Sequence, residues 1–154
     1  MRTAALALTF AVLAAAPALA APPSDTDAAA LRVLAAEADK AWNAADVDGM
    51  AAYYAPDATL QVTGRGDQFV GREPIRRYFG EAFARRPGVF RHITEIRRMD
   101  AVAPGLVFTD ADVRVEQQQA DGGWKLVRAF GNVSVAARDG QGWKLRAVRA
   151  WPVS

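Results

Sequence analysis

The sequence contains no cysteine and only one histidine. Without a thiol, the chain has no disulfide, no cysteine nucleophile, no thiolate metal ligand and no cysteine for a lipid anchor. A catalytic metal site needs about three protein ligands, and one imidazole among scattered carboxylates gives no such spacing. We therefore expect no metal and no other cofactor, and a fold that depends on packing alone.

An excess of charge of one sign is also missing. The chain has 19 Lys+Arg and 17 Asp+Glu, a formal net charge of +2. It has no run of basic residues interleaved with aromatic ones, so we expect no nucleic-acid partner. A glycine-rich phosphate-binding loop and a GxSxG nucleophile motif are absent from the sequence, and neither phosphate binding at such a loop nor acyl transfer is expected.

The first twenty residues have the pattern of a secretory signal peptide. Arg2 gives a positive start, residues 4–16 form an apolar run, and Ala18-Leu19-Ala20 is a small-residue cleavage site. The apolar run is short for a transmembrane helix. We therefore predict a periplasmic or secreted protein with no stable membrane anchor after cleavage. A flexible polar leader over 21–27 and one domain over 28–154 would follow.

Hydrophobic periodicity predicts three helices in the first half of this domain. Residues 28–43 carry an apolar stripe at steps of three and four, and Thr26 or Asp27 is positioned to cap this helix. Asp46 is the expected N-cap of a second, short helix that Pro56 ends. The segment GREP at 71–74 opens a third helix, whose stripe consists of Ile75, Tyr78, Phe79, Ala82 and Phe83.

Strand patterns dominate the second half. Residues 59–63 alternate as a short strand, and 68–70 are its possible return strand. Four long strands joined by tight turns follow, predicted over 90–102, 106–119, 124–137 and 143–153. The predicted fold is α+β: a curved antiparallel sheet of four long strands plus a short N-terminal strand or hairpin. Three helices on its concave face would complete a cone that is open at one end.

These elements carry sequences that resemble the nuclear transport factor 2-like superfamily, with its cystatin-like α+β fold. The resemblance lies in AWNAADVDGMAAYYAPDATL, in GREPIRRYF and in the closing GWKLRAVRAW. Within the superfamily, the chain is most similar to exported SnoaL-like proteins of the SgcJ/EcaC type. The resemblance implies a pocket between the helices and the sheet, and a homodimer formed through the outer sheet face. It does not imply one activity, because one fold hosts many sites.

The sequence lacks the residues that are required for ketosteroid isomerisation, the best-known activity of this fold. That reaction needs a carboxylate base, a tyrosine and a protonated acid. By the resemblance, the base falls near Val62, the tyrosine near Ala38 and the acid near Gly131 or Asn132. None of these residues has the required side chain, so we do not expect a ketosteroid isomerase. Polyketide cyclases and dehydratases of this fold use a His/Asp pair, and one histidine is available.

The candidate site residues come from both halves of the chain. His92 is the only imidazole and the candidate acid/base, with a structural histidine as the alternative. On the strand 124–137, one face combines Arg128, Phe130 and Asn132 in a mixed polar and aromatic wall. Arg149 alternates with apolar residues on the last strand, where a charge is costly unless it is paired. Arg149 therefore either extends to the rim of the pocket or meets an acidic ligand. The expected ligand-binding residues are Trp42, Tyr54, His92, Asn132 and Arg149.

Three functions remain open at the level of sequence. The first is an exported protein that binds a small apolar or aromatic ligand with a carbonyl or acidic group. The second is a cofactor-independent cyclase, dehydratase or isomerase in which His92 transfers a proton. The third is a non-catalytic dimeric module that binds a partner through the polar outer face of the sheet.

Overall fold

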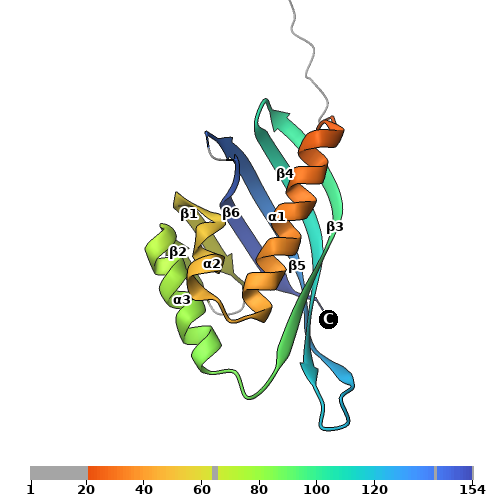
Figure 1. Ribbon diagram of the computed structural model, residues 1–154. Helices are drawn as coiled ribbons and strands as arrows, with labels where there is room; N and C mark the ends of the chain where they lie inside the picture. The colour runs from red at the N-terminus through yellow and green to blue at the C-terminus, as the bar shows by residue number, and fades with distance from the viewer. Residues whose placement is uncertain (1–20, 64–65, 141, 154) are drawn as a thin grey trace, which may run out of the picture.

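The computed structural model describes residues 21–63, 66–140 and 142–153, and the predicted signal peptide lies outside these ranges. The described chain contains three helices and six strands (Figure 1). Their bounds are α1 Asp25–Asn43, α2 Val47–Ala52, β1 Tyr54–Val62, β2 Asp67–Val70, α3 Arg72–Ala84, β3 Phe90–Ala103, β4 Leu106–Gln118, β5 Trp124–Asp139 and β6 Gly142–Pro152. The predicted α+β class and the order of elements are confirmed.

The six strands form one curved sheet in the order β2-β1-β6-β5-β4-β3. The possible return strand exists, so the short N-terminal element is the hairpin β1–β2. The prediction of a fully antiparallel sheet is wrong at one place, because β1 pairs in parallel with β6. β1 also begins at Tyr54, earlier than predicted, and Pro56 lies where the β1–β6 register shifts. A proline lacks the N–H that a regular ladder needs, and this irregular stretch does not require one.

The N-terminal helix begins earlier than its apolar stripe indicates. Ser24, and not Thr26 or Asp27, is the N-cap of α1, and its hydroxyl accepts from the Asp27 amide at 3.2 Å. Residues 25–27, predicted as part of the leader, are therefore the first turn of the helix. Asp46 caps α2 as predicted, with Oδ1 accepting from the Gly49 amide at 2.9 Å.

The helices lie against one side of the sheet and divide the core into two clusters. Figure 1 shows α1 across the long strands, with α2 and α3 beside β1 and β2. One cluster joins the buried face of α3 to α2 and β1, and it includes Ile75, Phe79 and Phe83 of the predicted stripe. The other holds Leu31 against β4, β5 and β6. Of the described helices, none combines the length and apolar character needed to cross a bilayer.

Candidate functional site

A cavity of about 770 Å³ lies between the helices and the sheet. All three helices and strands β1, β3, β4, β5 and β6 contribute lining residues. Most of the lining is aliphatic or aromatic. Among the described residues, Asp39 is the only carboxylate that lines the cavity, against three arginines and one histidine. The cavity is thus mainly apolar, with a few polar groups at defined places, as is common in small-molecule binding sites.

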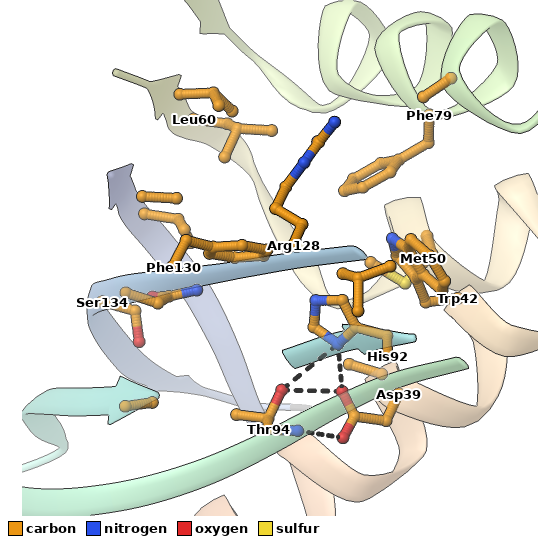
Figure 2. A pocket seen from close by; sticks show the side chains of 18 of the residues that line it. Asp39, Trp42, Met50, Leu60, Phe79, His92, Thr94, Arg128, Phe130 and Ser134 are labelled. Carbon is orange, nitrogen blue, oxygen red and sulfur yellow. Dashed lines mark hydrogen bonds and ion pairs between the residues drawn. The ribbon is translucent and has the colours of Figure 1, made fainter. Parts of the chain in front are cut away.

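The polar centre of the cavity is a contact between α1 and β3 (Figure 2). Oδ1 of Asp39 lies 2.6 Å from Nδ1 of His92 and accepts from the Thr94 hydroxyl at 2.7 Å. Its other oxygen, Oδ2, accepts from the Thr94 amide at 2.7 Å. An ionised carboxylate only accepts hydrogen bonds, so Nδ1 carries the proton and Nε2 of a neutral imidazole is left as an acceptor.

A second α1 residue fixes the backbone that carries His92. The Asn43 side chain accepts from the His92 amide at 2.6 Å and donates to the His92 carbonyl at 3.3 Å. Asp39 and Asn43 are four positions apart, so they project from the same side of the helix. Together they hold the end of α1 against the start of β3.

Aromatic rings surround the imidazole on the cavity side. The His92 ring centroid lies 5.0 Å from that of Trp42 and 5.8 Å from that of Phe130. None of the hydrogen bonds among the described residues uses Nε2 of His92, and Figure 2 shows the ring between Trp42 and Phe130. The imidazole is therefore oriented by a carboxylate on one side and presents its other nitrogen to the cavity.

A half-buried arginine packs against Trp42. The Arg86 guanidinium carbon is 3.5 Å from the Trp42 ring centroid and 3.9 Å from that of Phe83, and Nη1 donates to the Trp42 carbonyl at 2.8 Å. Its Nη2 atom is buried and has no hydrogen-bond partner among the described residues. Burial lowers the pKa of Arg86 to about 10, so the group still carries its charge at neutral pH.

Four of the five residues predicted to bind a ligand line this cavity: Trp42, Tyr54, His92 and Asn132. Tyr54 is almost fully buried, and this burial raises the pKa of its phenol. Arg149 is the exception and is not among the lining residues. Its Nη1 donates instead to the Thr59 hydroxyl at 3.1 Å and to the Val148 carbonyl at 2.8 Å.

A β-bulge explains why Arg149 was misplaced. Simple alternation puts Trp143, Leu145 and Arg149 on one face of the strand. In the structure, Val135 pairs with Ala147 while Ala136 pairs with Leu145, so Arg146 is one residue too many on β6. An extra residue reverses the alternation beyond it. Val148 and Ala150 then line the cavity, and Arg149 points to the opposite face.

Three lining residues that matter most chemically were not among the predicted ligand-binding residues: Asp39, Arg86 and Arg128. Asp39 is a charged residue that does not continue the apolar stripe of α1, and Arg86 follows the end of α3, so neither position has a sequence pattern that indicates a site. Only Arg128 could have been predicted from the sequence, because it shares the mixed polar and aromatic face of the strand 124–137 with Phe130 and Asn132. All three residues line the cavity.

The positions tested for ketosteroid isomerisation also face the cavity. Ala38, Val62 and Asn132 are all lining residues, so the predicted register places them correctly. Their side chains hold no carboxylate and no phenol. Within the described ranges, no group of three or more His, Asp or Glu side chains is arranged to hold a metal ion.

The profile of the SnoaL-like domain family matches residues 35–153, most of the chain and nearly all of its helices and strands. The chain therefore belongs to the SnoaL-like family of the nuclear transport factor 2-like superfamily. A comparison with the sequences of curated proteins finds no match. The exported SgcJ/EcaC branch expected from the sequence stays a prediction.

Solved structures of other proteins share the fold. A Nostoc punctiforme domain of unknown function with a cystatin-like fold is 21% identical, with a TM-score of 0.73 over 86% of this chain and 80% of its own. A Catenulispora acidiphila protein in complex with S-DNPA is 22% identical, with a TM-score of 0.71 over 81% and 92%. A ketosteroid isomerase-like protein from Erwinia carotovora atroseptica is 18% identical, with a TM-score of 0.67 over 84% and 98%.

Proposed function

We propose that this protein is a cofactor-independent enzyme that transfers a proton on a small apolar or aromatic molecule bearing a carbonyl or acidic group. Cyclisation, dehydration and isomerisation are the reaction classes that such a site serves. The observation that carries the proposal is the 2.6 Å contact of His92 Nδ1 with Asp39, which leaves Nε2 directed into a cavity of about 770 Å³.

The roles follow from this arrangement. His92 Nε2 removes a proton from the bound molecule and becomes an imidazolium. Asp39 keeps the imidazole in the required tautomer and stabilises the imidazolium that forms, while Thr94 holds Asp39 in place through two hydrogen bonds of 2.7 Å. Trp42 and Phe130 exclude water around the imidazole, which strengthens its interaction with the carboxylate. The protonated Nε2 then returns the proton to another atom of the same molecule.

The proposal can be tested without knowing the natural substrate. 5-Nitrobenzisoxazole is a small aromatic probe that a base opens by removing its C3 proton, while the N–O bond breaks and a coloured phenolate is released. We expect the purified protein to open it faster than the same concentration of free imidazole. His92→Gln should reduce the rate by about 10² or more, the usual contribution of a positioned general base. Circular dichroism checks that the variant is folded.

Two results would contradict the proposal. One is a wild-type rate no higher than that of free imidazole. The other is an unchanged rate in a folded His92→Gln protein. Either result, together with tight binding of small aromatic molecules, would favour the binding function without turnover, because the cavity is compatible with both.

Export and self-association are part of the same proposal. The signal-peptide pattern supports a mature periplasmic or secreted protein that begins near Ala21. N-terminal sequencing of protein from the periplasm or medium tests this cleavage. The family resemblance supports a homodimer through the outer sheet face, and native mass spectrometry reads the subunit number together with any co-purified small molecule. A strictly monomeric protein would contradict the dimer.

A further inference from the structure

The cavity holds more positive charge than its own residues can balance. Its lining includes Arg85, Arg86 and Arg128, whereas Asp39 is the only carboxylate among the described lining residues. Asp39 is already hydrogen-bonded to His92 and Thr94. Arg85 lies 3.7 Å from Glu81, and both side chains are exposed. Arg86 and Arg128 have no carboxylate partner in the described part of the chain.

Arg128 is the more accessible of the two. It lies on β5 two residues before Phe130, on the same face of the strand, and no hydrogen bond or ion pair of its side chain is found among the described residues. Figure 2 shows its side chain extending from β5 into the space between Leu60 and Phe79, on the cavity side of His92. A guanidinium offers five donors in a planar fork that matches a carboxylate. Arg128 lines the cavity and is also exposed, so its donors are accessible to a ligand that enters from solvent.

Arg86 adds a fixed charge in the cavity wall. Its guanidinium is held against Trp42 and Phe83, and Nη2 is buried without a partner among the described residues. Arg86 is half-buried, and burying even part of a cation without a counter-ion has a cost in a folded protein. An anion in the cavity would lower that cost, since attraction between charges is stronger where water is excluded.

We infer that the cavity binds an apolar or aromatic carboxylic acid, whose carboxylate is held by Arg128 and attracted by Arg86 while its apolar part lies against the aromatic wall. This inference rests on the proposed function in that it assigns the substrate class of the same cavity. It replaces Arg149, which the sequence indicated as the partner of an acidic group. A molecule held at Arg128 has its apolar part in the space that the His92 ring faces.

The test compares two matched probes, naphthalene-2-carboxylate and its neutral amide, by isothermal titration calorimetry at constant ionic strength. We expect the wild-type protein to bind the carboxylate at least about tenfold more tightly, the range of a charge-assisted bidentate contact. Arg128→Gln should reduce this preference to about twofold or less. Arg32→Gln removes the same charge from an exposed position of α1 outside the lining, and should keep the preference.

The outcomes separate this inference from the proposed function. Equal affinity of the wild-type protein for both probes, or an unchanged preference in Arg128→Gln, would overturn the carboxylate site. Binding is measured without turnover, so a carboxylate preference that depends on Arg128 stands even if His92 catalyses nothing. Arg86→Met gives a second measurement, and it should weaken carboxylate binding while leaving amide binding within about twofold.

Discussion

Asp39 and His92 are 53 positions apart in the chain and meet with 2.6 Å between Oδ1 and Nδ1. The same carboxylate binds both the amide and the hydroxyl of Thr94, at 2.7 Å each. One side chain of α1 thus orients the imidazole and joins the helix to β3. Asp39 serves the fold as well as the site, and its removal should affect both.

Asp39→Ala should lower the free energy of unfolding by about 1–3 kcal/mol, because the Thr94 amide loses its partner in a partly buried place. Asp39→Asn should cost less, since the amide oxygen can still accept that hydrogen bond. Urea denaturation measures both. Glu37→Ala is the control on the same helix, where only a surface pair with Lys40 is lost, and its effect should stay within about 0.5 kcal/mol. Equal effects of Asp39→Ala and Glu37→Ala would contradict this role.

A buried hydroxyl pair in the cavity wall gives a second prediction. Thr109 Oγ1 and Ser134 Oγ lie 2.6 Å apart on neighbouring strands. Ser134→Ala should cost about 1–2 kcal/mol, because the Thr109 hydroxyl is left without this partner. The double variant with Thr109→Val removes both hydroxyls and should cost clearly less than the sum of the single changes. A double-mutant cycle by urea denaturation measures this coupling, and strictly additive effects would show that the pair is not a unit.

Gly131 and Trp151 are cross-strand neighbours in close contact. A Cβ atom at Gly131 would lie 2.6 Å from two carbons of the Trp151 ring, so Gly131→Ala must displace the indole. We expect a loss of about 1–3 kcal/mol, typical of overpacking, together with a shifted tryptophan emission. Gly140→Ala is the matched control, because a Cβ there meets nothing within 4 Å. A Gly131→Ala protein with wild-type stability and emission would disprove the contact.

Arg86 should contribute more to ligand binding than to stability. Arg86 is half-buried and has no carboxylate partner among the described residues. Replacing such a charge by an apolar side chain of similar length is often neutral or favourable, so Arg86→Met should lower the free energy of unfolding by no more than about 0.5 kcal/mol. A thermal or urea midpoint well below that of the wild type would assign Arg86 a structural role instead.

The difference in unfolding free energy between the wild type and Arg86→Met should change with pH in a definite direction. Burial lowers the pKa of Arg86 to about 10, so the folded chain holds this proton less tightly than the unfolded chain does. The charged Arg86 therefore lowers the stability of the fold by its full amount below this pKa. This loss of stability becomes smaller as the pH rises through about 10 and Arg86 loses its proton. The difference between the wild type and Arg86→Met should therefore move in favour of the wild type between pH 8 and 10.5. A constant difference would contradict the burial of the charge.

Periodicity was sufficient for the fold because the sheet and helices bury regular faces. The stripe of α3 and the alternation of the long strands each predict which side chains are buried, and Ile75 and Val113 are almost completely so. The first residues of helices and strands were harder to predict, since a serine outside the apolar stripe caps α1. The parallel pairing of β1 with β6 was not predictable either, because no local sequence pattern indicates it.

The site was predictable only in part, for a physical reason. Trp42, Tyr54, His92 and Asn132 could be placed because each lies on a regular face. A single carboxylate at the edge of an amphipathic helix has the same local pattern whether it meets solvent or an imidazole, so Asp39 could not be distinguished from its charged neighbours. Arg149 shows the complementary error, because one extra residue in β6 invalidates the alternation from which its direction was inferred.

That extra residue separates the sequence pattern of the last strand from the faces that its side chains occupy. Removing Arg146 alone would leave Leu145 opposite Ala136 and Ala147 opposite Val135, so β6 would become a regular strand. Val148 and Ala150 would still face the cavity, and Arg149 would still face away from it. If Arg146 instead took a regular place in the ladder, Arg149 would turn inward and an aliphatic wall would become a cationic one. Relatives that lack this one residue should consequently keep the aliphatic lining.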